Sequence, residues 1–265
     1  MRRGTALLVL LHLPPLTLPL LGFRTVDEWA FAILFLTAAV GVGVGLHRYF
    51  AHRSFETSRI GQIVLGLLAA SAFGDPIGFS GKHRLHHRRA DAPNDVHSPR
   101  QGFWHCWLGS LVDDGCTPKE VARVTPDLAR FAELRWLQRY YYLVALALGL
   151  GTYLAGGWSM FAMGFCLSRV TAIHLSSAVN YFGHYVGTRR YPTSDDSTNH
   201  PLLALLTFGE GWHNNHHRYP RAARAGFAWW ELDLFYYALR LLAGLGLVWN
   251  VREVPLAVRR EGGLA

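Results

Sequence analysis

Histidine is the residue type whose spacing in this sequence most clearly indicates chemistry. Nine of the 14 histidines occur at four places, most of them in short groups. Residues three or four positions apart share a helix face, so the imidazoles of each triplet can point into one cavity, and a pair five positions apart fits a helix end whose last turn loosens. The nine are His47 and His52; His83, His86 and His87; His213, His216 and His217; and the isolated His184.

Several histidine groups that converge on one point predict a metal site. A single His-x-x-His-His motif on a surface helix is more often solvated, but three groups without a matching cysteine or carboxylate cluster indicate a site built from imidazoles. Structural zinc takes four ligands, usually with thiolates. Eight or nine imidazoles are too many for one ion and suit two ions with four or five nitrogens each. Imidazole binds zinc, copper, iron and nickel, so the donor set leaves the metal open.

Four apolar stretches must position these histidines, because each is close to the roughly 20 residues that a membrane-spanning helix needs. Residues 23–27 join the first two stretches and residues 156–157 join the last two, which predicts two helical hairpins. The predicted spans cover residues 5–22, 28–46, 138–156 and 158–180. Two further apolar stretches, 60–80 and 232–249, are interrupted by charged residues or by glycine and proline. Both are interpreted as helices at the membrane surface, with a full membrane span as the alternative.

The distribution of positive charge orients this arrangement. Residues 47–135 carry twelve lysines and arginines and residues 181–265 carry nine, whereas the two hairpin loops carry only Arg24. Cytoplasmic segments are enriched in these residues, so both long segments and both chain ends are expected in the cytoplasm. The predicted fold is an all-α membrane protein, a single domain over residues 1–265, with four transmembrane helices as two hairpins and a cytoplasmic helical cap that holds a histidine-rich di-metal site. A signal peptide is the alternative for residues 5–22, although no small-x-small cleavage site follows.

Composition favours a membrane protein over other classes of basic protein. Hydrophobic residues make up 51% of the chain and charged residues 17%, below the roughly 25% usual for a soluble domain. The net charge is +8, but the arginines are interspersed with acids and form no dense basic patch, which argues against nucleic-acid binding. The three cysteines, Cys106, Cys116 and Cys166, cannot form a disulfide framework.

Taken together, the histidine segments resemble the sequence boxes of the membrane fatty acid desaturase family. They read HRYFAH at 47–52, HRLHHRRADAPNDVHSPRQGFW at 83–104, VNYFGH at 179–184 and FGEGWHNNHHRYP at 208–220. The last is the most specific, since the third box of the family reads Glu-Gly-aromatic-His-Asn-x-His-His. The similarity covers nearly the whole chain and is greatest to the acyl-CoA Δ9, stearoyl-CoA type, branch.

The resemblance implies a role for the nine histidines and for several neighbouring residues. All nine become ligands of a di-iron centre. Asn180 matches the asparagine that holds one metal through a water, and Asp95 and His97 match groups that orient ligand imidazoles. Phe79 keeps an aromatic side chain where the family shapes the bent acyl chain, and Ser176 is its counterpart on the last span. Further candidates for the lining of an acyl tunnel are Trp104 and Trp212.

The resemblance also implies a reaction and its partners. The expected activity is the introduction of a cis double bond into a long acyl chain, with O2 as co-substrate and electrons from an external ferredoxin or cytochrome with its reductase. The stearoyl-CoA branch typically has Trp-Ala-Arg-Asp before the second box, where this chain has Phe-Ser-Gly-Lys at 79–82. The acyl carrier therefore stays open between CoA, acyl carrier protein and a membrane lipid. The expected location is a bacterial inner membrane, with the catalytic site on the cytoplasmic side.

Two other functions use similar residues. A fatty acyl or hydrocarbon hydroxylase, or another oxygenase of the wider membrane di-iron group, has similar histidine clusters and inserts oxygen instead. A metal transporter usually places polar ligands inside its spans near the midplane, whereas these groups lie at the predicted membrane exits. The spacing therefore favours an enzyme over a transporter, and product analysis separates the two enzymes.

Overall fold

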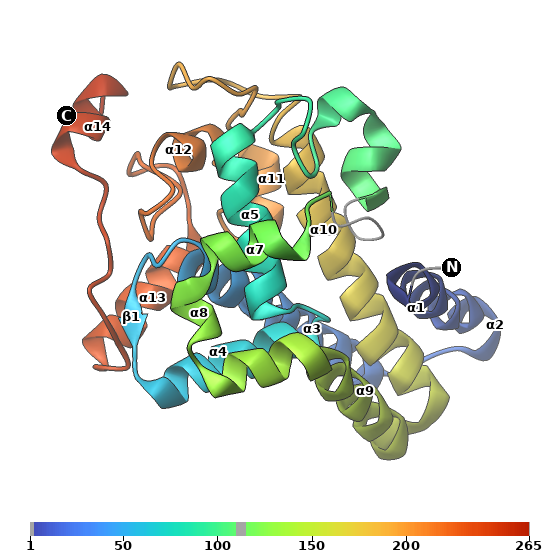
Figure 1. Ribbon diagram of the computed structural model, residues 1–265. Helices are drawn as coiled ribbons and strands as arrows, with labels where there is room; N and C mark the ends of the chain where they lie inside the picture. Colours follow the sequence, from blue (N-terminus) through green and yellow to red (C-terminus); the bar gives the residue numbers. More distant parts are fainter. Residues whose placement is uncertain (1–2, 110–114, 265) are drawn as a thin grey trace.

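The described chain folds almost entirely into helices. The computed structural model describes residues 3–109 and 115–264, and Figure 1 shows long helices such as α9 at the bottom with shorter helices and loops above them. Two short strands, β1 (Glu56–Thr57) and β2 (Val248–Trp249), pair antiparallel with Glu56 opposite Trp249. This pair ties the segment after the first histidine box to the C-terminal region.

Two helical segments are long and apolar enough to cross a membrane. The first, Thr25–Ala51, joins α3 (Thr25–Ala39) to the π-helix η2 (Val40–Ala51) and has a mean hydropathy of 2.1. The second, Ala132–Phe182, has a mean hydropathy of 1.4 and consists of α9 (Ala132–Met160), the π-helix η5 (Phe161–Leu167) and α10 (Ser168–Phe182). Three of the four predicted spans, 28–46, 138–156 and 158–180, lie inside these two segments.

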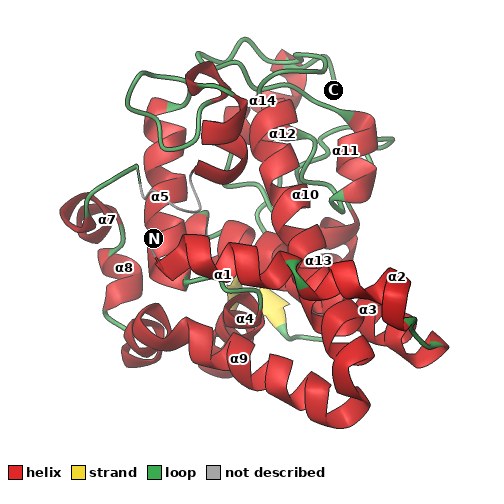
Figure 2. Ribbon diagram, turned by 90° about the vertical axis from the view of Figure 1, so that its right-hand side faces the viewer, coloured by secondary structure: helices red, strands yellow, loops and turns green. Residues whose placement is uncertain are grey.

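The second segment is broken at Gly157. This residue has φ +71° and ψ −158°, a conformation outside the helical region that glycine adopts at little cost. Figures 1 and 2 show the chain turning back at the far end of α9, so that η5 returns alongside α9 and also packs against α3. The break coincides with residues 156–157, where the sequence predicts a hairpin loop.

Residues 5–22 do not form the single helix predicted for the first span. The chain there divides into α1 (Arg3–His12), the 3-10 helix η1 (Pro14–Thr17) and α2 (Leu18–Leu21). Prolines occupy the first turns of η1 and α2, where their missing N–H is tolerated, whereas a continuous helix through them is not. The apolar stretch Val9–Leu21 is shorter than the roughly 20 residues of a straight span.

The predicted surface stretch 60–80 lies in two helices, α4 (Arg59–Ser71) and α5 (Pro76–Arg89), bent by 84°. The Asp75 side chain caps α5, since it accepts hydrogen bonds from the N–H groups of Ile77 and Gly78 at 2.9 and 3.0 Å. Only when taken together are the two helices long and apolar enough to span a membrane. The other surface stretch, 232–249, contains α13 (Leu234–Gly244).

Short helices and a compact apolar core hold the segments that carry histidines. The core packs around η2, α4, the start of α9 and α13, and it includes the fully buried Phe50, Phe55, Leu134 and Leu239. Because Phe50 lies between His47 and His52, this core fixes the first histidine box. The remaining helices of the described residues are η3 (Pro99–Gln101), η4 (His105–Gly109), α7 (Pro118–Val124), α8 (Pro126–Ala129), α11 (Pro201–Leu206), α12 (His213–Arg218) and α14 (Leu256–Glu261).

Candidate metal centre

The first histidine box lies at the end of η2. Hydrogen bonds in a π-helix run from residue i+5 to residue i, and the His52 N–H donates to the His47 carbonyl at 3.2 Å. A spacing of five therefore places both imidazoles on one face, as expected from a loosened last turn. The other elements supply His83, His86 and His87 from α5, His184 from the loop after α10, and His213, His216 and His217 from α12.

Five imidazoles form the first group, which we call the five-nitrogen group. Their Nε2 atoms make a chain of close contacts, 2.7 Å between His52 and His83 and 3.0 Å for each of the other three. Those three contacts join His83 to His87, His87 to His216 and His216 to His47. Nitrogens from η2, α5 and α12 thus face a common point, a geometry suited to one metal ion.

The remaining four imidazoles form the four-nitrogen group. The Nε2 atoms of His184 and His213 are 3.0 Å apart, and the ligand atoms of all four members lie within 4.8 Å of one another. In the described residues, the Nε2 atoms of His86 and His217 are buried without a hydrogen-bond partner. A buried polar atom in this state is costly unless it binds a ligand, and its lone pair is available to a metal.

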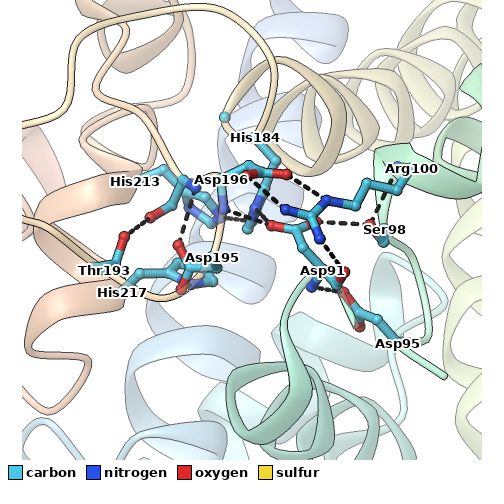
Figure 3. Close-up of polar contacts among 12 residues, drawn as sticks. Asp91, Asp95, Ser98, Arg100, His184, Thr193, Asp195, Asp196, His213 and His217 are labelled. Carbon is cyan, nitrogen blue, oxygen red and sulfur yellow. Dashed lines mark hydrogen bonds and ion pairs between the residues drawn. The ribbon is translucent and has the colours of Figure 1, made fainter. Parts of the chain in front are cut away.

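Carboxylates hold four of the nine imidazoles from behind, at Nδ1. Such a contact fixes the proton on Nδ1 and leaves the Nε2 lone pair for a metal. Figure 3 shows Asp91 and Asp195 beside His184 and His217. The four Nδ1–carboxylate distances are 2.5 Å for His47–Glu210, 2.9 Å for His86–Asp95, 2.8 Å for His184–Asp91 and 2.9 Å for His217–Asp195.

Burial sets the protonation of these groups. It lowers the pKa of the three α12 histidines well below 6.5, so their imidazoles are neutral at pH 7 and can bind a metal. Burial also raises the pKa of Asp95 to about 6. At Asp91 burial likewise acts to raise the pKa, but the hydrogen bonds that its carboxylate accepts from His184, the Asp196 N–H and the Ser98 hydroxyl outweigh burial and lower the pKa.

The arrangement fits two metal ions that accept imidazole nitrogen. It provides five nitrogens joined by close contacts in one group and four in the other, and carboxylates orient four of the rings. The number of clustered imidazoles in the sequence predicts the same division, four or five nitrogens for each ion. Both groups lie beside the ends of helices that are long enough to span a membrane.

Asp95, His97 and Asn180 are predicted to support the ligands, and they differ in where they lie relative to the imidazoles. Asp95 contacts His86, as the resemblance implies. His97 is buried, and its ring stacks on His86 with centroids 4.0 Å apart; burial lowers its pKa to about 3. Asn180 lies on α10 one helical turn before His184.

Of the four predicted substrate residues, only Ser176 lines the apolar cavity next to the imidazole groups. Phe79 stacks on His83 at 5.6 Å, and Ser176 lines an apolar cavity of about 50 Å³ whose wall also includes Glu210, the partner of His47. Trp104 is 72% exposed. Trp212 is buried, donates to the Leu232 carbonyl at 2.8 Å and packs with two alanines. Neither tryptophan lines this cavity.

Sequence reasoning missed three of the four carboxylates, Asp91, Asp195 and Glu210. Asp91 lies 93 residues from its partner His184, and Asp195 lies 22 residues from its partner His217. Glu210 belongs to a different histidine box from its partner His47. One signal was available for two of them: Asp91 lies four residues after His87, and Glu210 lies three residues before His213.

The fold and the two imidazole groups define a class, helical proteins with apolar segments of membrane-spanning length and buried histidine clusters able to bind metal. Within this class, the chain belongs to the fatty acid desaturase family. The family model described as "Fatty acid desaturase" matches residues 27–252. The resemblance noted in the sequence is thereby confirmed.

Named relatives cover most of the chain. It is 38% identical over 224 residues to the sn-1 stearoyl-lipid 9-desaturase of Anabaena variabilis, covering 84% of this chain and 82% of the relative. It is 37% identical over 239 residues to the icosanoyl-CoA 5-desaturase of Limnanthes douglasii, covering 88% and 67%. It is 34% identical over 236 residues to the Delta-9 acyl-lipid desaturase 2 of Arabidopsis thaliana, covering 88% and 77%. Relatives thus include enzymes named for acyl-lipid and for acyl-CoA substrates, so the stearoyl-CoA likeness does not decide the carrier.

Proposed function

We propose that the protein is an O2-dependent fatty acyl desaturase that introduces a cis double bond into a long acyl chain at a di-iron centre. The observation that carries the proposal is the convergence of nine imidazoles into a five-nitrogen and a four-nitrogen group. The proposed ligands are these nine histidines, with Asn180 contributing through a water. The desaturase names of its relatives support the reaction type.

The protein contributes position and dryness to this chemistry. Two iron ions bound at the groups would supply O2 activation and the removal of hydrogen from unactivated methylene groups. Asp91, Asp95, Asp195 and Glu210 hold imidazoles in the tautomer that presents Nε2 to a metal. Burial of the rings excludes bulk water from the same space.

The acyl chain is proposed to enter the cavity that Ser176 and Glu210 line, beside His47. Its walls come from α3, η2, α10 and the segment around Phe208, and they are almost wholly apolar. A cavity of about 50 Å³ accepts only a short part of an acyl chain, so lining side chains must move aside when substrate binds. Phe79 lies against His83, at the iron end of the proposed path. Trp104 and Trp212 are left out of this path.

The orientation in the membrane belongs to the same proposal. The span Thr25–Ala51 and the broken segment Ala132–Phe182 would form membrane helices, with the histidines at the cytoplasmic surface. The electron donor would be a separate ferredoxin or a cytochrome with its reductase. The acyl carrier would be CoA or a membrane lipid, as for the named relatives. A bacterial inner membrane is the proposed location.

Fatty acid profiling tests the function. The chain is expressed in a bacterial host without a desaturase, and total fatty acids are analysed by gas chromatography and mass spectrometry. A new monoene is expected, absent from a variant with His213→Ala and His217→Ala, and fragmentation gives the bond position. His200→Asn is the matched control, because His200 caps α11 outside both imidazole groups and asparagine also caps well.

Other outcomes decide against desaturation. Hydroxylated products would identify an oxygenase, the alternative for this type of centre. Unchanged lipids from protein that carries two irons, supplied with a ferredoxin and with a cytochrome donor in turn, would contradict the proposed reaction. Iron content of the purified protein is therefore measured beside the lipid profile.

A further inference from the structure

A second cavity, of about 510 Å³, lies beside the end of η2. Its lining comes from residues 49–62, residues 127–131, Arg221 and Arg252, and includes none of the nine grouped histidines. Figure 1 shows β1, the start of α4 and α8 next to one another on this side of the molecule. Four separate parts of the chain thus converge on a space that the proposed reaction does not use.

The lining of this cavity is strongly basic. It carries five arginines against the two carboxylates Glu56 and Asp127. Arg53 pairs with Asp127 at 3.0 Å, and Arg59 makes two 3.0 Å hydrogen bonds with Glu133. Among residues 3–109 and 115–264, no carboxylate lies within ion-pair distance of the other three, Arg130, Arg221 and Arg252.

Unpaired guanidinium groups around one cavity favour an anion with several oxygen atoms. The planar guanidinium donates two parallel hydrogen bonds to a phosphate, and a cavity of this volume holds a phosphate together with part of its ester. The cavity therefore indicates a phosphate ester as ligand.

The surface next to the cavity is apolar. Ile60, Val64 and Leu67 follow one face of α4 and are 75%, 48% and 41% exposed. On the other side, the Trp249 indole donates to the lining residue Glu56 at 3.1 Å and is itself 43% exposed. Arginines beside exposed aliphatic and tryptophan side chains are typical of a protein at headgroup depth in a membrane.

We propose that this cavity binds the phosphate of an anionic glycerophospholipid, with Arg130, Arg221 and Arg252 as donors and the lipid tails along the exposed face of α4. A membrane lipid is favoured over a soluble phosphate ester because the apolar rim matches acyl tails. The bound lipid is distinct from the acyl chain proposed to be desaturated, so the inference stands independently of the reaction.

Native mass spectrometry of the purified full chain tests the site. The protein is titrated with phosphatidylglycerol and with phosphatidylcholine of identical acyl chains. The wild type is expected to prefer phosphatidylglycerol, and the double variant Arg221→Gln, Arg252→Gln should lose about 30-fold in affinity for it. The matched control, Arg259→Gln with Arg260→Gln on α14, removes the same charge from two exposed arginines outside the cavity and should bind as the wild type does.

Three outcomes would overturn the proposal. The first is unchanged affinity for phosphatidylglycerol in the double variant, and the second is an equal loss in the α14 control. The third is that coenzyme A displaces bound phosphatidylglycerol at a lower concentration than the lipid needs to bind, which would assign the cavity to a soluble phosphate ester. Arg130→Gln provides a second test through one substitution, with a smaller loss expected. Iron content and unfolding temperature confirm that each variant is folded.

Discussion

At the scale of single residues, the centre depends on carboxylates that contact only the outer edge of the imidazoles. Asp91 shows how much structure supports one such contact. Its carboxylate accepts hydrogen bonds from His184, from the Ser98 hydroxyl at 2.7 Å and from the Asp196 N–H at 2.8 Å. Its backbone has φ +60°, a strained region that aspartate tolerates better than most residues.

Replacing this carboxylate should weaken metal binding without removing a ligand. In Asp91→Asn the amide is a weaker acceptor for His184 Nδ1–H, so the orientation of that ring is lost. We expect iron affinity to fall about 10-fold to 100-fold, measured by competition with a chelator. Asp196→Asn is the control, because its carboxylate pairs with Arg100 at the surface. Equal losses in both variants would contradict the role of Asp91.

Ser176 tests the proposed acyl path at the same scale. In Ser176→Phe the ring fills the cavity of about 50 Å³, so long acyl chains should be excluded. We expect a shift towards shorter products in the fatty acid profile, with iron content unchanged. Leu154→Phe, at a 74% exposed position of α9, adds a similar ring outside the cavity and should leave the profile as it is. An unaltered profile in Ser176→Phe would place the acyl chain elsewhere.

At the scale of elements, Arg84 links the first two histidine boxes. It projects from α5 and donates to the Phe50 and Ala51 carbonyls at the end of η2, both at 2.8 Å. It also donates to the Val124 carbonyl at 2.7 Å and pairs with Asp127, which lies in α8. One guanidinium therefore satisfies carbonyls at a helix end, where backbone partners are missing, and fixes η2 against α5.

Arg84→Ala should separate these elements. It leaves three carbonyls without a donor, a loss of about 3 kcal/mol in the free energy of unfolding. The five-nitrogen group draws on both η2 and α5, so we expect it to lose iron first, leaving about one iron per chain by mass spectrometry of metal content. Arg88→Ala, exposed on the same helix, should keep both irons. Full iron content in Arg84→Ala would contradict the link.

Asp127 gives the same junction a pH dependence. Burial acts to raise its pKa, but the hydrogen bond and charge of Arg84, together with Arg53, outweigh this and lower the pKa below 3.8. A carboxyl of lowered pKa contributes stability that is present above about pH 4 and is lost as pH falls through the folded-state value. The wild type should therefore unfold at a higher temperature than Asp127→Asn near neutral pH, and this difference should shrink below about pH 4. A difference independent of pH would contradict this account.

At the scale of the whole molecule, the proposed orientation predicts which surfaces face each side of the membrane. We expect an impermeant maleimide to label Phe23→Cys in intact cells, because residue 23 lies in a predicted outer loop and is 52% exposed. Arg260→Cys on α14 should react only after lysis. Both variants are made after replacement of Cys106, Cys116 and Cys166. Labelling of Arg260→Cys in intact cells would contradict the proposed topology and place α14 on the outer side of the membrane.

The sequence predicted what depends on local spacing, and the structure was needed for what depends on distant contacts. The histidine boxes lie within six residues each, so helical geometry alone groups them. The glycines at 156–157 likewise mark a break that the structure contains, whereas the stretch 5–22, predicted as one span, divides at its prolines. By contrast, the pairing of His184 with Asp91 spans 93 residues and follows only from the packed fold. An aromatic such as Trp212 has no pattern that separates packing from substrate contact.

The position of α12 has a consequence for biogenesis. This helix supplies a member to each imidazole group, and Asn215 within it is held by Glu231 at 2.8 Å and by the Ala225 carbonyl. Neither group can close until the ribosome has released the chain beyond residue 231, long after the first two boxes have emerged. The proposed iron would therefore be inserted after translation is nearly complete. Until then the nascent protein presents half-assembled ligand sets that the cell must shield from competing metals.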